Sequence, residues 1–176
     1  MARISSFPPI ADAGCRLLIL GSMPGEASLA AGQYYAHPRN AFWPVMGQLI
    51  GFQPGVEYPW RVEALLGAGI ALWDVLKSCE RSGSLDSAIL RGSLQANDFP
   101  AFFERHPQIT RVAFNGATAE QLFRRHVSHG LPAGLAPRSL VRLPSTSPAH
   151  ASLSLEEKAR QWRALLGFSG PSVGTD

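Results

Sequence analysis

Four polar or glycine-rich segments of this sequence begin where a short apolar run ends. They are residues 21–40, Asp74, Asn115 and residues 144–150. If the apolar runs are strands of one parallel sheet, all four segments lie at its carboxyl edge, where such folds bind ligands. Asp74 could act there as a general base, although hydrogen bonding to loop backbone is the commoner role of such a residue. The function predicted from this sequence depends on this convergence.

The first segment opens with residues 21–25, which read GSMPG. This is not a phosphate loop, because neither a GxGxxG pattern nor a GK[ST] ending is present. The glycines instead allow a ligand to approach the backbone closely. No GxSxG element occurs either, which disfavours an α/β-hydrolase of another kind. A small nucleotide-binding protein is disfavoured for the same lack of a phosphate loop.

The charge of the chain permits a polyanionic partner without requiring one. The 176 residues carry a formal net charge of +3, and the sequence pI is about 9.2. Lys77 and Lys158 are the only lysines, so arginine supplies most of the positive charge. Arginine suits bidentate contacts to phosphate. Ordinary composition bias is the alternative explanation.

The cysteines and the N-terminal segment exclude several classes of protein. Cys15 and Cys79 are isolated, and no CxxC or Cys/His set suggests zinc or an iron–sulfur cluster. Two separate cysteines fit a reducing cytoplasm. Neither a signal peptide nor an apolar run long enough to span a membrane is expected. We therefore predict a cytoplasmic protein without a metal site.

Apolar periodicity places the elements that position the four segments. Compact apolar runs predict buried strands over residues 16–20, 69–73, 111–114 and 139–143. Helical spacing or capping residues predict helices over residues 42–50, 61–66, 98–105, 117–127 and 155–166. Pro44 is best tolerated in the first turn of its helix, and Ser154 with Glu157 forms a capping-box pattern.

Alternation of strands with helices predicts the fold class. It is an α/β fold of three layers, α/β/α, around a central, mostly parallel four-stranded sheet. Residues 1–176 form a single domain, with an irregular lead-in over residues 1–14 and a loose tail over residues 169–176. Residues 80–97 are expected to be irregular, with one helical turn near residues 85–90.

Three motifs together carry a resemblance to a known family. GSMPG at residues 21–25 is followed by QYYAHPRNAFW at residues 33–43 and by LPSTSPA at residues 143–149. In this order the motifs resemble the uracil-DNA glycosylase superfamily. The chain is similar to its mismatch-specific uracil-DNA glycosylases and, more closely, to the hypoxanthine (deoxyinosine) DNA glycosylases. The resemblance implies a uracil-DNA glycosylase-like fold.

The resemblance assigns roles in the first two motifs. Ser22 and Met23 flank the base pocket, and Met23 stands where mismatch-specific enzymes carry a water-activating Asn. Asn40 takes the catalytic role, since an amide can accept from a water and hold it below the anomeric carbon; helix capping is its alternative. Tyr35 aligns with the aromatic ring on which the flipped base stacks, with core packing as its alternative. His37 is expected to be structural.

The later motifs complete the implied site. Asn115 is the base-reading amide, whose donor and acceptor suit the edge of hypoxanthine, or else a turn residue before a helix. The 143–149 loop enters the minor groove and fills the gap left by the flipped nucleotide. Leu143 replaces a usual polar residue there. The predicted DNA contacts are Ser145, Thr146, Ser147, Arg39 and His150, with Arg138 and Arg142 extending the footprint.

The predicted protein is a monofunctional DNA-repair glycosylase without a cofactor. It flips a deaminated base, hypoxanthine first and uracil second, out of DNA and hydrolyses its N-glycosidic bond. The partner is double-stranded DNA containing a deaminated base, with single-stranded DNA as a further substrate, and the protein is a monomer. No lysine is placed as a lyase nucleophile. The alternative is a catalytically weak or inactive lesion-binding module of the same fold.

Overall fold

A parallel four-stranded sheet forms the centre of the computed structural model, which describes residues 2–53 and 55–169. Its strands run in the order β3-β2-β6-β7, and every pair is parallel. They are β2 (Leu17–Gly21), β3 (Ile70–Asp74), β6 (Arg111–Asn115) and β7 (Ser139–Leu143). Each strand was predicted from its apolar run to within two residues. The three-layer α/β/α fold class is confirmed.

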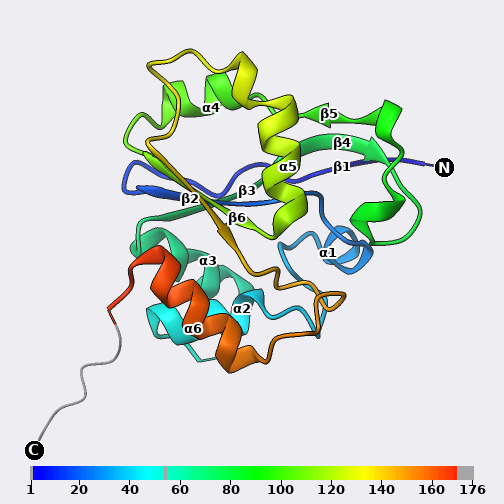
Figure 1. Cartoon of the computed structure of the whole chain (residues 1–176). Coiled ribbons are helices and arrows are strands. Elements are labelled where there is room, and N and C mark those ends of the chain that lie inside the picture. The colour runs from blue at the N-terminus through cyan, green and yellow to red at the C-terminus, as the bar shows by residue number, and fades with distance from the viewer. Residues whose placement is uncertain (1, 54, 170–176) are drawn as a thin grey trace, which may run out of the picture.

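Helices cover both faces of this sheet (Figure 1). The alternation of side chains along β2 sends Leu17 and Ile19 to one face and Leu18 and Leu20 to the other. The first face packs against α2 (Phe42–Ile50), α3 (Tyr58–Gly67) and α6 (Leu155–Leu166). The second face packs against α4 (Phe99–Arg105) and α5 (Ala117–His126). Because both faces are buried, all of β2 is apolar.

A second, smaller sheet extends this core. Its strands β1 (Arg3–Ser5), β4 (Leu76–Glu80) and β5 (Gln95–Ala96) are antiparallel in the order β1-β4-β5. The expectation of an irregular lead-in is therefore wrong for β1, which pairs along β4. Residues 76–80 form β4, for which the sequence predicted no element, and residues 95–96, expected to be irregular, form β5. Backbone pairing, not an apolar pattern, produces these strands.

Three further short helical elements lie outside the predicted helices, and the helical turn expected near residues 85–90 is confirmed by η1 (Asp86–Ala88). Within residues 21–39 lies α1 (Glu26–Ala31), and the segment 80–97 holds two 3₁₀ turns, η1 (Asp86–Ala88) and η2 (Arg91–Ser93). A third turn, η3 (Ser128–Gly130), follows α5. These elements do not change the order of the layers.

Capping residues set the helix ends where the sequence predicted them. The Asp98 carboxylate accepts from the Ala101 amide at 3.1 Å and begins α4. The Ser154 hydroxyl accepts from the Glu157 amide at 3.2 Å and begins α6. The Glu157 carboxylate bonds Arg160 and Gln161 instead of closing a capping box. Pro44 lies in the first turn of α2.

The expected loose tail lies, apart from Ser169, outside the described residues. Among the helices of the described ranges, none has the length and apolar character needed to cross a membrane.

Candidate active site

The four segments at the strand ends meet around one cleft of about 1210 Å³. Residues 21–28 line it from the end of β2, Asp74 from β3, residues 115–118 from β6 and residues 142–150 from β7. Side chains from residues 34–40 and 84–87 complete the wall. The parallel topology accounts for this convergence, because all four carboxyl ends face the same edge.

The loop of residues 144–150 is tied to the end of β6 by a reciprocal pair of hydrogen bonds. Nδ2 of Asn115 donates to Thr146 Oγ1 at 2.8 Å, and the Thr146 amide donates to Asn115 Oδ1 at 2.9 Å. Gly116 has φ +95°, and a Cβ there would lie 3.0 Å from Ser145 Cβ. Asn115 keeps one amide hydrogen and one lone pair for a ligand. Its predicted contact with a base uses only that remainder.

Tyr35 holds its ring at the cleft in a strained backbone conformation. Its φ of +53° is the only positive value among the described non-glycine residues, and such conformations persist where the surroundings enforce them. The ring stacks on Phe42 with centroids 4.1 Å apart and planes at 22°. One face of Tyr35 is thus packed on the core, while the residue also lines the cleft.

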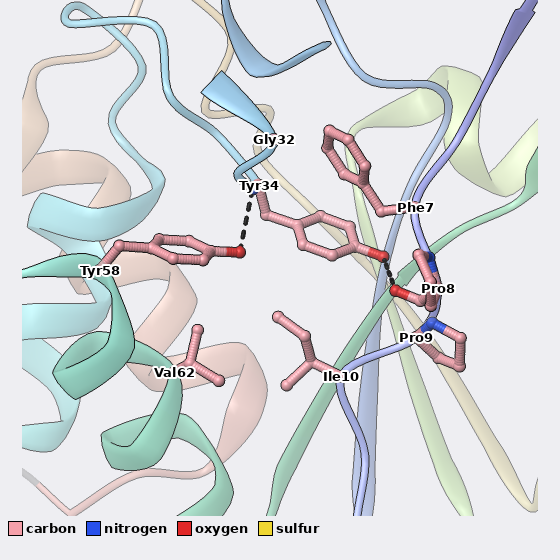
Figure 2. A pocket seen from close by; sticks show the side chains of 8 residues that line it. All are labelled: Phe7, Pro8, Pro9, Ile10, Gly32, Tyr34, Tyr58 and Val62. Carbon is pink, nitrogen blue, oxygen red and sulfur yellow. Dashed lines mark hydrogen bonds between the residues drawn. The ribbon is translucent and has the colours of Figure 1, made fainter. Parts of the chain in front are cut away.

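A second cavity, of about 300 Å³, shows how the neighbouring Tyr34 is anchored (Figure 2). The Tyr34 hydroxyl donates to the Pro8 carbonyl at 2.8 Å, and its backbone amide donates to the Tyr58 hydroxyl at 3.1 Å. Its carbonyl accepts from Trp43 Nε1 at 2.8 Å. These bonds fix the chain just before Tyr35. The cavity lies between the lead-in and α3 and is lined mainly by apolar side chains.

Asn40 lies immediately before α2 and lines the cleft. The side-chain Oδ1 of Asn40 accepts from the backbone amide of Phe42 at 2.9 Å. The backbone amide of Asn40 donates to the His37 carbonyl at 2.9 Å. Asn40 is not the N-cap of α2, which is Ala41, but it binds the first residue of the helix from one position earlier. Within the described ranges Nδ2 of Asn40 has no hydrogen-bond partner, so the side chain can hold the start of the helix and still bind a ligand or water.

Asp74 and Tyr35 bring two polar groups to the floor of the cleft. A Cβ on Gly21 would lie 2.5 Å from Asp74 Oδ1 and 2.8 Å from the Tyr35 hydroxyl oxygen, so only glycine fits there. In the described part of the chain, Asp74 Oδ2 has no hydrogen-bond partner, and the Tyr35 hydroxyl has none in good hydrogen-bonding geometry. Burial raises the pKa of the Tyr35 hydroxyl and the nearby Asp74 charge adds to this, while the Asn115 side chain beside the hydroxyl lowers it.

The carboxyl of Asp74 titrates near neutral pH. Burial and, to a smaller extent, the negative charge of Asp86 raise its pKa to about 7, and Arg81 opposes both. The expected hydrogen bonds from loop backbone do not reach Oδ2; Asn97 instead donates to the backbone carbonyl of Asp74 at 2.8 Å. A buried carboxyl with a raised pKa in a cleft is typical of a functional site.

Sequence reasoning missed Asp86 and Arg81. The Ser22 hydroxyl donates to Asp86 Oδ2 at 2.6 Å, which closes the cleft beside the first loop. Arg81 is 5% exposed and donates to the Pro24 and Gly83 carbonyls, and it lies 4.0 Å from Asp86. Burial raises the pKa of the Asp86 carboxyl, while the Ser22 hydrogen bond and Arg81 lower it. Nothing in the spacing of residues 80–97 indicates these contacts.

The other predicted site residues fall into a buried and an exposed group. Met23 is 7% exposed and packs mainly against Leu76 and Cys79. Thr146 is 1% exposed, so its hydroxyl supports Asn115 and is not free for a phosphate. Exposed or half-buried around the cleft are Arg39, Ser145, Ser147, His150 and His37. Within residues 2–53 and 55–169, no cluster of three His, Cys, Asp or Glu could hold a metal ion.

The fold and the cleft are those expected of a protein that binds a nucleobase extruded from a nucleic acid. A parallel sheet carries at its carboxyl edge an aromatic ring, two carboxamides and a hydroxyl-rich loop, with arginines on the rim. This set suits an extruded nucleobase below a phosphate backbone.

Comparisons with known proteins give the particular family. A family profile described as the uracil DNA glycosylase superfamily matches residues 8–166, and the chain belongs to this superfamily. A hypoxanthine DNA glycosylase of Methanosarcina acetivorans is 35% identical over 91% of this chain and 96% of its own. One of Methanosarcina barkeri is 40% identical over 62% of this chain and 69% of its own.

A solved structure agrees with this assignment. It is the solution NMR structure of a protein from Methanosarcina acetivorans that was provisionally called a uracil DNA glycosylase. It matches with a TM-score of 0.71 and 33% identity over 94% of this chain and 99% of that chain. The superfamily and fold expected from the sequence are confirmed.

Proposed function

We propose that the protein is a monofunctional DNA glycosylase of base excision repair that removes hypoxanthine, and uracil second, from double-stranded DNA. The observation that carries this proposal is the convergence of Tyr35, Asn40 and the 144–150 loop on one cleft. The names of the Methanosarcina relatives favour hypoxanthine. Two isolated, buried cysteines suit a reducing cytoplasm, and we propose that the enzyme acts there as a monomer.

The roles of the site residues in this proposal follow the geometry. The extruded base stacks on the face of Tyr35 that is turned away from Phe42, on the side of the cleft. Asn40 positions a water for attack on C1′ of the deoxyribose, while its Oδ1 also accepts from the backbone amide of Phe42 at the start of α2. The C1′–N bond breaks as the C1′–O bond forms. The base leaves with the bonding electrons and is protonated, the attacking water gives up one proton and leaves its hydroxyl on C1′, and an abasic site remains.

Contacts outside the pocket hold the DNA backbone. Ser145, Ser147, Arg39 and His150 surround the cleft and are free to bind phosphates. The buried Thr146 supports these contacts through Asn115.

Base release from labelled oligonucleotides tests this function. Duplex and single-stranded substrates carry deoxyinosine, deoxyuridine or deoxyxanthosine at one position, and alkali cleaves the strand wherever a base has been removed. We expect release from deoxyinosine to be fastest and deoxyuridine to come second. Tight binding to all lesions without release would instead show a lesion-binding module, and the proposal would be abandoned.

A further inference from the structure

Leu85 presents an apolar side chain at the entrance of the cleft that the reaction described above does not use. It lines the cleft and is 56% exposed, so it lies at the rim and not on the floor. Single exposed leucines are common on protein surfaces. Leu85 differs from them because the loop that carries it is held in place on both sides, at the proposed DNA-binding site.

The 82–88 loop that carries Leu85 is closed at its base by backbone pairing. Arg81 and Ile89 form an antiparallel bridge on either side of it. Nε of Arg81 also donates to the Gly83 carbonyl at 2.8 Å. Leu85 therefore stands at the middle of a closed loop.

The tip of this loop is bonded to the segment that follows β2. On one side of Leu85, the Ser84 hydroxyl oxygen accepts from the Glu26 amide at 2.9 Å. On the other side, the Asp86 carboxylate accepts from the Ser22 hydroxyl at 2.6 Å. The backbone around Leu85 is thus fixed before DNA binds, so little conformational entropy is lost when its side chain becomes buried.

The charges around Leu85 favour contact with bases over contact with phosphates. The charged side chains beside it that line the cleft are the carboxylates of Glu26 and Asp86, which repel phosphate. Arg81 lies 4.0 Å from Asp86, but it is 5% exposed and not free for a phosphate. The side chains proposed to hold the DNA backbone come from other segments of the wall. An apolar side chain among carboxylates suits the uncharged faces of the bases.

Extrusion of a nucleotide leaves a space in the base stack beside the cleft. Proteins that open a base step insert apolar side chains there, leucine among them. The 144–150 loop was expected to fill this space, but its exposed side chains are Ala149 and His150, of which one is short and the other polar. We propose that Leu85 enters the duplex where the nucleotide has left and packs between the neighbouring bases. The inference rests on the proposed glycosylase function and adds to it the surface that meets the base stack.

Single-turnover base release by the full chain tests this role. Deoxyinosine is placed in a duplex opposite thymine and in the same strand alone, which has no paired stack to fill. The measured quantity is the ratio of the duplex rate to the single-strand rate. We expect Leu85→Ala to lower this ratio about tenfold to a hundredfold, the equivalent of burying one leucine side chain. Leu90→Ala is the matched control, because Leu90 is 47% exposed in the same segment but is not among the described residues that line the cleft, and it should keep the wild-type ratio.

A bulky nucleotide opposite the lesion distinguishes filling of the space from a structural effect. A pyrene deoxynucleotide in that position occupies the space of the lost pair itself. On this duplex the difference between Leu85→Ala and the wild-type protein should therefore disappear. Asn40→Ala, whose expected defect lies in the chemical step, should gain nothing from the pyrene. This comparison needs only duplex DNA, so it remains decisive if single strands are not cleaved.

Three outcomes would overturn the inference. They are a Leu85→Ala protein that matches the wild-type protein on the thymine duplex, a loss of duplex activity in Leu85→Ala that the pyrene does not restore, and transfer of the whole pattern to Leu165→Ala. Leu165 is the 43% exposed leucine of α6 that also lines the cleft, and the last outcome would assign the contact to α6 instead. Failure of the proposed function would appear separately, as the absence of base release from both natural deoxyinosine substrates by the wild-type protein.

Discussion

At the scale of single residues, Asn40 makes a structural hydrogen bond with the same side chain for which we propose a chemical role. Its Oδ1 accepts from the Phe42 amide, which fixes the orientation of the carboxamide at the cleft. A group held in this way needs no reorganisation when it positions a water. The hydrogen bond to the start of α2 and the proposed catalytic role are therefore compatible in one side chain.

Substitution of Asn40 separates the two roles. Asn40→Ala should lower single-turnover base release by about 100-fold or more and lower the free energy of unfolding by about 1 kcal/mol through loss of the hydrogen bond to the Phe42 amide. Asn40→Ser keeps an oxygen that can accept from this amide, so it should retain stability but not activity. Thermal unfolding and single-turnover kinetics measure the two effects. Full activity in Asn40→Ser would refute the catalytic assignment.

At the scale of elements, the 144–150 loop is held by three parts of the fold. Asn115 binds it from β6, and the Ala41 amide before α2 donates to the Thr146 carbonyl at 3.0 Å. From α6, Trp162 Nε1 donates to the Pro144 carbonyl at 2.8 Å, and Lys158 Nζ donates to the His150 carbonyl at 2.7 Å. The loop is therefore presented to DNA in a preformed shape.

Lys158→Met tests the contribution of α6 to this shape. Lys158 is 4% exposed, and methionine fills a similar volume without the hydrogen bond to His150. We expect amide hydrogen exchange in the loop to rise and affinity for lesion-containing DNA to fall about threefold to tenfold, about one net hydrogen bond. Lys77→Met, at the other and exposed lysine, is the matched control and should change neither. Unchanged exchange in Lys158→Met would show that the loop does not need this anchor.

The burial of each strand explains whether the sequence predicts it. β2, β3 and the middle of β6 are buried on both faces, so their apolar runs identify them. β7, at the edge of the sheet, is mostly half-buried or exposed, but Leu140, Val141 and Leu143 still mark it as a strand. In β4, by contrast, Leu76, Ser78 and Cys79 are buried while Lys77 is exposed. Such a mixed pattern is too weak to predict a strand, and β1 and β5 are three and two residues long.

The site shows the same division. The sequence predicts Tyr35, Asn40 and Asn115 at the cleft because Asn115 ends β6 and the other two lie in the segment that leads from β2 to α2. Asp86 and Arg81 join the site through tertiary contacts to Ser22 and Pro24. Those contacts depend on how the 81–93 segment folds back, which no local pattern encodes. The burial of Thr146 likewise follows from its pairing with Asn115 across two strands.

At the scale of the whole molecule, a net charge of +3 is modest for a DNA-binding protein. Affinity then depends on where the arginines lie. Arg39 is exposed at the rim of the cleft and has no carboxylate partner in the described part of the chain. Arg142 also lines the cleft, but its guanidinium is bound to Glu120, which also binds Arg124 at 2.9 Å. A phosphate would have to compete with this carboxylate.

The salt dependence of DNA binding measures this difference. Each phosphate contact contributes about 0.9 to the slope of log K against log salt concentration. Arg39→Ala should therefore reduce the slope by about 0.9, and Arg142→Ala by less, because Glu120 already neutralises Arg142 in the free protein. Arg105→Ala, at the end of α4 before the amino ends of the strands, is the control and should leave the slope unchanged. Equal losses of slope at Arg105 and Arg39 would mean that DNA is held by diffuse charge and not by the rim of the cleft.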